Sequence, residues 1–210
     1  MTAAVQTLSP DYSHKDETSA RVGMWLFLFT EILLFGGLFL LFSVYRSKFP
    51  ADFHFAAGTL DNLTAAISTA VLLTASLTMM MAVAHLERNN RKPASVFLGA
   101  TILLGIAFLF IRWFEWSAKF QQGLYPNSTV LQQHTAGENV FYSLYYLMTG
   151  IHALHIVIVL IVSVVMFFLV YYSHADVMLE LGGKVENAGL YWHMMNITWI
   201  FLFTLLYLVT

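Results

Sequence analysis

The sequence predicts an all-α, polytopic membrane protein, a bundle of five transmembrane helices. Hydrophobic residues make up 59% of the 210 positions and charged residues only 10%, whereas soluble domains carry roughly 25% charged residues. The mean hydropathy of +0.70 points the same way. A chain of this length with five long apolar stretches suits one compact bundle rather than several domains.

A polar amino-terminal tail, residues 1–21, precedes a membrane domain at 22–210. The tail mixes acidic with basic residues and has no apolar core, so we do not expect a cleaved signal peptide. A spanning helix needs about 20 mostly apolar residues. Stretches of this kind lie at 22–45, 62–85, 95–118, 141–172 and 188–209.

Local signals mark the spans in order along the chain. The first begins directly after Arg21, and the second is opened by Asp61 and Asn62, residue types that cap helix N-termini. The third follows Pro93, at a place where the missing proline N–H costs least. The fourth lies within 139–173, a run without any Asp, Glu, Lys or Arg, and the fifth is the last apolar stretch. All four prolines fall outside the span interiors, which agrees with helices at these places.

Basic residues between the spans predict the orientation in the membrane, because cytoplasmic loops carry an excess of Lys and Arg. Six lie on the side of the amino terminus: Lys15, Arg21, Arg88, Arg91, Lys92 and Lys184. Three lie on the other side: Arg46, Lys48 and Lys119. We therefore expect a cytoplasmic amino terminus and an outward-facing carboxy terminus.

Composition excludes several functions. The chain has no Cys, which excludes disulfides, thiolate metal ligands, iron–sulfur clusters and Cys-containing copper sites. Its net charge of −2 gives no indication of a nucleic acid or an acidic substrate. The odd number of spans argues against a transporter built from two inverted halves.

Ionisable residues inside the predicted spans are candidates for functional residues. Each costs at least about 2.5–3.5 kcal/mol at the membrane centre unless it is paired or hydrated. Arg112 and Glu115 are oppositely charged and three residues apart, so they can neutralise each other on one helix face. Glu31 has no partner nearby in the sequence. It needs one on another helix, a bound proton, or a cavity filled by water or lipid headgroups.

The depth of each polar residue follows from about 1.5 Å of rise per residue, counted from the middle of its span. His152 falls at a similar outer depth to Glu115, and His155 falls near the middle. The inner half contains Glu31, His193 and Asn196. These depths allow His152 to meet Glu115, and Glu31 to meet His193.

The histidines could be haem or metal ligands, members of a proton relay, or hydrogen-bond partners between helices. His152 and His155 are one turn apart on one helix, so they cannot ligate one haem from opposite faces. No three or four N, O or S ligands are spaced to converge on a catalytic metal. We therefore expect this chain to bind no metal and to have no catalytic residues, with its polar groups joining helices.

Small residues recur along the second span at Ala66, Ala70, Thr74 and Thr78. Such a face lets another helix backbone approach closely. We expect it to pack tightly inside the bundle.

Four motifs, in this order along the chain, resemble subunit III of the haem–copper respiratory oxidases, the cytochrome c oxidase type. "LFTEILLFGGLF" places Glu31 on the family's membrane carboxylate, and "ILLGIAFLFIRWFEW" matches through Gly105, Phe108 and Glu115. "TGIHALHIVIV" matches through Thr149, Gly150, His152 and His155. The carboxy-terminal "ENAGLYWHMMNITWIFLFTLLYL" matches through Tyr191, Trp192, His193, Trp199 and Phe203.

The chain departs from the family pattern at four of these positions. Asn196 stands where the family usually has Asp, and Arg112 where it has Gln. Trp116 replaces Tyr, and Ala153 replaces Gly. The five spans resemble the short bacterial form of the family, which lacks the first two helices of the seven-helix members.

The resemblance implies an accessory subunit of an oxidoreductase complex that pumps protons in aerobic respiration, in a bacterial inner membrane. Haem and copper belong to the partner subunits I and II, and this chain binds neither. It would stabilise the catalytic subunit and support proton uptake and the access of lipid or O₂. Bound phospholipid and membership of a larger respiratory supercomplex are also implied, with Glu31 as a carboxylate facing a lipid cleft.

Other functions remain open on the sequence. The chain could be the equivalent subunit of a quinol oxidase. It could also be a membrane protein associated with nitric oxide reductase, because a protein of that kind has a sequence similar to residues 55–74 of this chain. A b-type cytochrome would need histidines at matching depth on facing helices. A small channel or transporter would need a continuous polar path.

Overall fold

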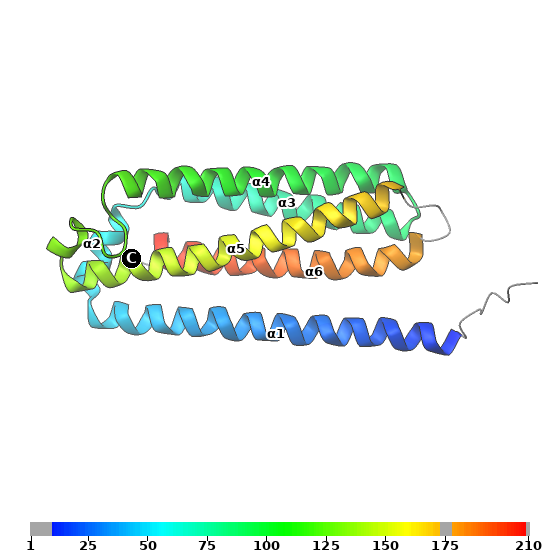
Figure 1. Ribbon diagram of the computed structural model, residues 1–210, viewed down its shortest axis with the longest axis horizontal. Helices are drawn as coiled ribbons and strands as arrows, with labels where there is room; N and C mark the ends of the chain where they lie inside the picture. The colour runs from blue at the N-terminus through cyan, green and yellow to red at the C-terminus, as the bar shows by residue number, and fades with distance from the viewer. Residues whose placement is uncertain (1–9, 173–177, 209–210) are drawn as a thin grey trace, which may run out of the picture.

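The computed structural model describes residues 10–172 and 178–208, and it describes side chains at 19, 21–172 and 182–208. Five long helices run side by side (Figure 1): α1 (Pro10–Lys48), α3 (Asn62–Glu87), α4 (Arg91–Gln121), α5 (Ala136–Tyr172) and α6 (Met178–Phe203). Three short elements join or extend them: α2 (Pro50–Gly58), the 3₁₀ turn η1 (Leu131–Gln133) and the π-helix η3 (Thr204–Leu208). The described part of the chain contains no β-strand.

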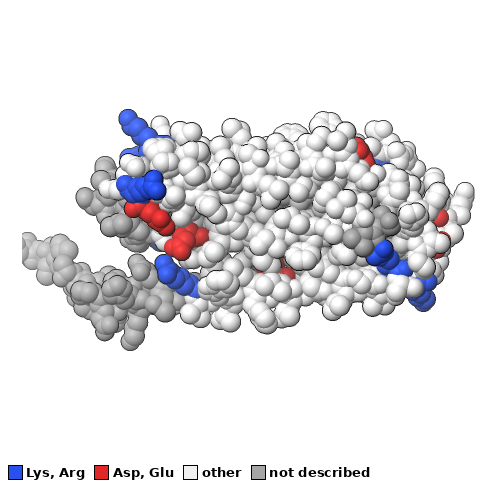
Figure 2. Space-filling model, turned by 180° about the vertical axis from the view of Figure 1, so that it is seen from behind, with Lys and Arg blue, Asp and Glu red and all other residues white. Residues whose placement is uncertain are grey.

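The prediction of five membrane-spanning helices is confirmed. Within the described residues, five helical segments are long and apolar enough to cross a membrane: Arg21–Lys48, Asn62–Glu87, Arg91–Gln121, Ala136–Tyr172 and Gly182–Leu208. Charged side chains gather toward the two ends of the molecule, while uncharged residues cover most of its middle (Figure 2). This distribution matches a bundle whose middle lies in hydrocarbon and whose ends lie in water.

The helices begin and end where the backbone groups find partners. The Asp61 side chain accepts hydrogen bonds from the backbone N–H groups of Leu63 (3.0 Å) and Thr64 (3.3 Å) and from the Thr64 hydroxyl, so it caps α3. The hydrogen bond from the Thr64 hydroxyl is the main reason that the pKa of Asp61 is lowered. At the other end of α3, Asn89 has a φ of 57°, the left-handed conformation that ends many helices, and the chain reverses directly into α4.

Helix α2 was not predicted from the sequence. Pro50 starts it, Asp52 lies in its first turn, and Phe53, Ala56 and Ala57 are buried. It packs across the start of α5 at Gly137, where an added Cβ would lie 2.6 Å from the Cβ of Asp52. Glycine is therefore required at this close approach.

The core lies where α3, α4, α5 and α6 meet. Gly105 of α4 lies at a close approach in this core, because an added Cβ would lie 2.7 Å from Leu160 Cδ2 and 2.8 Å from Trp192 Cη2. Helix α1 is more peripheral (Figure 1), and 22% of its most apolar window is buried, against 50% for the last span. Much of its surface therefore faces lipid or another protein.

The small-residue face expected to pack inside the bundle requires a correction. Ala66, Ala70 and Thr74 are exposed on α3, while Thr78 is partly buried and lies 2.8 Å from the Thr101 hydroxyl of α4. The buried face of α3 consists of Ala65, Ser68, Leu72, Ala75, Met79, Ala82 and Leu86. Small residues occur on both faces, and the rotation of α3 is set by the larger Leu72 and Met79, which occupy the core.

Candidate functional site

The ion pair between Arg112 and Glu115 forms within one turn of α4, as the spacing predicts, and it is almost completely buried. Two tyrosine hydroxyls donate to the same carboxylate oxygen, Glu115 Oε1: Tyr145 of α5 at 2.7 Å and Tyr207 of η3 at 2.5 Å. Arg112 donates to the Tyr207 oxygen at 3.0 Å and to Ser68 of α3 at 3.2 Å. We call these five residues the Arg112 cluster.

The Arg112 cluster ties together the helices that form the core. Its members come from α3, α4, α5 and the C-terminal π-helix. The two charged residues lie on α4, and the other three elements each supply one hydroxyl group that bonds to them. The guanidinium also lies 4.7 Å from the ring centre of Trp199 on α6, a cation–π distance. Charge-assisted hydrogen bonds of this kind are the strong ones in a region of low dielectric constant. The arrangement therefore joins the bundle and leaves little of either charge unpaired.

Glu31 and His155 form the second buried pair, between α1 and α5. His155 Nε2 lies 2.9 Å from Glu31 Oε2, and the two side chains are 11% and 9% exposed. The other ring nitrogen, Nδ1, lies 2.7 Å from the Ile151 carbonyl oxygen, which can only accept. Nδ1 therefore carries a hydrogen, and the Nε2 contact is an ion-pair contact rather than a well-aligned hydrogen bond.

The contact gives each of these nearly buried side chains a polar partner on another helix. Such pairing is how ionisable groups are commonly accommodated inside a membrane. It also joins α1 to the rest of the bundle.

His152 occupies a different environment from the one that its depth predicts. It is completely buried, and neither ring nitrogen has a hydrogen-bond partner in the described structure. Aromatic rings surround it, with Trp199 at 5.2 Å and Phe108 at 5.8 Å between ring centres. Its predicted contact with Glu115 is replaced by this packing, because Tyr145 and Tyr207 occupy the hydrogen-bonding positions on that carboxylate.

His193 and Asn196 join α6 to α3. His193 Nδ1 lies 2.5 Å from the Ser76 hydroxyl, so its predicted contact with Glu31 is not formed. Asn196 donates to the Leu72 carbonyl oxygen at 2.9 Å. Both contacts bridge two helices, which is the role that polar residues commonly have between transmembrane helices.

Several members of this polar core were not predicted from the sequence. Tyr145 and Tyr207 lie near the ends of apolar stretches, where tyrosine is common at membrane interfaces. Lys119, counted as a loop cation, is 6% exposed in the last turn of α4 and donates to the Thr59 carbonyl oxygen at 2.6 Å. Lys119 follows Glu115 by four residues and Arg112 by seven. This spacing indicates that the three side chains share one helix face.

Comparison with known proteins gives matches over nearly the whole chain. The family model for cytochrome c oxidase subunit III matches residues 3–210. Cytochrome c oxidase subunit 3 of Alkalihalophilus pseudofirmus is 30% identical over 223 residues, covering 100% of this chain and 98% of the relative. The Bacillus subtilis protein of that name is 29% identical over 209 residues, covering 99% and 95%.

A subunit of a different oxidase is also similar. Cytochrome bo(3) ubiquinol oxidase subunit 3 of Buchnera aphidicola is 24% identical over 187 residues, covering 89% of this chain and 92% of the relative. The full-length match to the family model, together with five spanning helices, establishes the family. The chain belongs to the cytochrome c oxidase subunit III family.

Proposed function

We propose that this chain is the accessory third subunit of a haem–copper terminal oxidase and that it carries out no redox chemistry itself. Its role is to stabilise the catalytic subunit and to support proton uptake and the access of lipid or O₂. Subunits I and II, which would carry the haem and copper, are its partners, together with phospholipid. The observation that carries this proposal is the internal pairing of its membrane-buried charges within a full-length family match.

The pairing supports a structural role because each buried charge already has a partner from this chain. Glu115 accepts hydrogen bonds from Tyr145 and Tyr207 and pairs with Arg112. Glu31 lies 2.9 Å from His155. A residue that performs acid–base chemistry on a substrate needs an approach for that substrate. The Arg112–Glu115 side chains, at 2% and 4% exposure, offer none.

The histidines of the membrane domain are poorly placed as ligands. His155 has one ring nitrogen on a carbonyl oxygen and the other on Glu31. His152 is enclosed by Phe35, Phe108 and Trp199. Among the described residues, no three His, Asp or Glu side chains come together as a metal site requires. These placements support the proposal that haem and copper are held by the partner subunits.

The orientation that we propose places the amino terminus in the cytoplasm and the carboxy terminus outside. The α3–α4 turn lies at the same end of the bundle as the start of α1, the end of α5 and the start of α6 (Figure 1). That end therefore contains Arg21, Arg88 and Lys184, whereas Arg46 and Lys48 lie at the other end. The excess of basic residues supports the cytoplasmic assignment of the first end.

A quinol oxidase is the second candidate complex, supported by the similarity to the ubiquinol oxidase subunit of Buchnera aphidicola. The chain would have the same accessory role there, because the electron donor binds to other subunits. The family match gives no support to a b-type cytochrome or a transporter.

The experiment is affinity purification of the tagged chain in a mild detergent, followed by identification of the stoichiometric partners. A haem–copper subunit I with a copper-binding subunit II supports a cytochrome c oxidase. A quinol-oxidising activity in the same preparation supports the second candidate. Co-purification with a nitric oxide reductase, or with no respiratory protein, would overturn the proposal.

A further inference from the structure

The connection from α4 to α5, residues 122–135, lies at the end of the bundle opposite the start of α1 (Figure 1). It is longer than a helix reversal needs, since residues 88–90 alone join α3 to α4. Helix connections in bundles usually have about 2–8 residues, and much longer ones are usually functional when they are ordered. The loop also has no long gap to cross, because α4 and α5 pack together close to it, with the ring centres of Trp116 and Tyr146 6.1 Å apart. Its length therefore needs another explanation.

The loop folds into a compact unit that is held by its own hydrogen bonds. The Ser128 hydroxyl donates to the Gly123 carbonyl oxygen and accepts from the backbone N–H of Leu131 at 3.0 Å. The Gln132 side chain donates to Asn127 Oδ1 at 3.1 Å. Leu131 is completely buried and attaches the loop to the hydrophobic core. A loop that is already ordered loses little conformational entropy when another molecule binds to it.

Two residues in the left-handed backbone conformation fix the path of the loop. Gly123 has a φ of 74°, and an added Cβ would lie 2.9 Å from Cγ2 of Val130. Asn127 has a φ of 66°. Glycine and asparagine are among the few residue types that adopt this conformation routinely. The sequence therefore specifies one shape for the loop.

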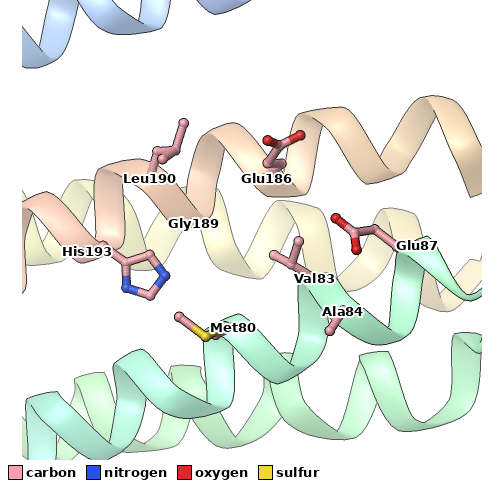
Figure 3. A pocket seen from close by; sticks show the side chains of 8 residues that line it. All are labelled: Met80, Val83, Ala84, Glu87, Glu186, Gly189, Leu190 and His193. Atoms are coloured by element: carbon pink, nitrogen blue, oxygen red, sulfur yellow. The ribbon is translucent and has the colours of Figure 1, made fainter.

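The loop is uncharged over its whole length. No Asp, Glu, Lys or Arg occurs between Lys119 and Glu138, and His134 lies 2.6 Å from the Glu138 carboxylate of α5. At the opposite end of the bundle, by contrast, Glu87 and Glu186 line a pocket between α3 and α6 (Figure 3). Soluble proteins carry roughly 25% charged residues, whereas the centres of protein–protein interfaces are depleted of charge. An uncharged loop at a water-facing end therefore indicates contact with another protein.

The exposed side chains of the loop combine apolar and hydrogen-bonding groups. Val130 and Tyr125 are 44% and 36% exposed, and the Tyr125 ring lies 5.2 Å from that of Phe120, which is 50% exposed. Exposed amide side chains accompany them in the same loop. Tyrosine and uncharged amides are common in protein-binding surfaces. We call the following residues the α4–α5 loop surface: Phe120, Tyr125, Asn127, Val130, Gln132 and Gln133.

We propose that the α4–α5 loop surface is a docking site for an uncharged, extramembrane surface of another subunit in the same complex. Tyr125 and Val130 pack against apolar groups of that subunit, and the Gln133 amide exchanges hydrogen bonds with its backbone. The inference rests on the proposed function, because it takes the chain to be one subunit of an oxidase complex. A phospholipid headgroup suits this surface less well, since phosphate is bound most strongly by Arg or Lys and the loop contains neither.

The first experiment places the photoreactive residue p-benzoylphenylalanine at Tyr125 or at Val130 in the membrane-embedded complex. After irradiation, both positions should give a covalent adduct with the same protein, and mass spectrometry should locate the link in an extramembrane segment. Phe168, which is 51% exposed on α5 toward the opposite end, is the control position and should not give that adduct. Adducts with phospholipid alone, or no adduct from either loop position, would overturn the proposal.

The second experiment measures the affinity of the chain for the rest of the complex. The purified chain is titrated into complex from which this subunit has been removed. Val130→Glu and Gln133→Glu each bring a charge into the proposed contact and should raise the dissociation constant at least about tenfold. The uncharged variants Val130→Thr and Gln133→Asn should change it less than about threefold. His54→Glu adds the same charge to an exposed residue of α2 at the same end and should leave it unchanged.

The two experiments separate this inference from the proposed function. A chain that binds no haem–copper subunit would refute the proposed function itself. A chain that binds them with unchanged affinity in both glutamate variants would refute only the docking site. Circular dichroism and tryptophan fluorescence of both variants should match those of the unaltered chain, because Val130 and Gln133 are exposed.

Discussion

Replacing Arg112 with leucine should destabilise the bundle strongly, because Glu115 would keep its charge in a buried site without a counter-ion. Removing one partner of a buried ion pair typically costs about 3–5 kcal/mol. The variant also loses the hydrogen bonds from Arg112 to Tyr207 (3.0 Å) and Ser68 (3.2 Å). The two tyrosine hydroxyls still donate to Glu115 and offset part of the loss.

We therefore expect Arg112→Leu to lower the free energy of unfolding by about 3–5 kcal/mol at pH 7. The double variant Arg112→Leu with Glu115→Gln removes both charges and should recover most of the loss at pH 7.

The assay is unfolding in mixed micelles of a mild detergent and sodium dodecyl sulfate, followed by tryptophan fluorescence and circular dichroism. The free energy of unfolding is compared among the unaltered chain, the single variant and the double variant at pH 7. A loss below about 1 kcal/mol at pH 7 would mean that the pair is not a buried ion pair of the usual strength. A double variant less stable than the single one would also refute the reasoning.

Substitutions at four further positions test the fold and the polar pairs. Gly105→Val should cost about 1–3 kcal/mol in the same unfolding assay through overpacking of the core. Asp61→Ala should lower the free energy of unfolding by about 1 kcal/mol at pH 7 through loss of the α3 cap. The hydrogen bond from Thr64 lowers the pKa of Asp61 in the folded chain. The stability that Asp61 contributes is therefore fully present above the ordinary pKa of aspartate and should be lost as the pH falls through the lowered pKa. His152→Phe should raise the free energy of unfolding by about 1 kcal/mol, since it removes a buried ring with no hydrogen-bond partner; a loss of stability would show that the ring has a partner. Glu31→Gln should leave the turnover and assembly of the purified complex unchanged. Glu31→Ala should lower the retention of the subunit or of phospholipid. Abolished turnover in Glu31→Gln would contradict an accessory role.

The number of spanning helices and the Arg112–Glu115 contact could be predicted because both depend on local sequence. A long apolar run predicts a membrane helix, and a three-residue spacing places two side chains on one helix face. Helix α2 could not be recognised in the same way, because its nine residues are too few to span and depend on packing against α5 at Gly137.

Partners across helices were harder to predict, because depth along a helix says nothing about rotation around its axis. Glu31 and His193 have similar depth, but the rotation of α1 and α5 brings Glu31 to His155 instead. The same reason explains why the buried face of α3 was predicted wrongly, because small residues lie on both its exposed and its buried face. Tyr207 reaches Glu115 from a π-helical turn, whose altered register does not follow from α-helical periodicity.

The most direct test of a non-redox role is the haem and copper content of the chain purified by itself, compared with that of the complex. The separately purified chain should show no Soret absorption and no stoichiometric copper, while the complex that contains it shows both. A stoichiometric haem spectrum from the chain alone, lost on substitution of His152 or His155, would contradict the proposed function.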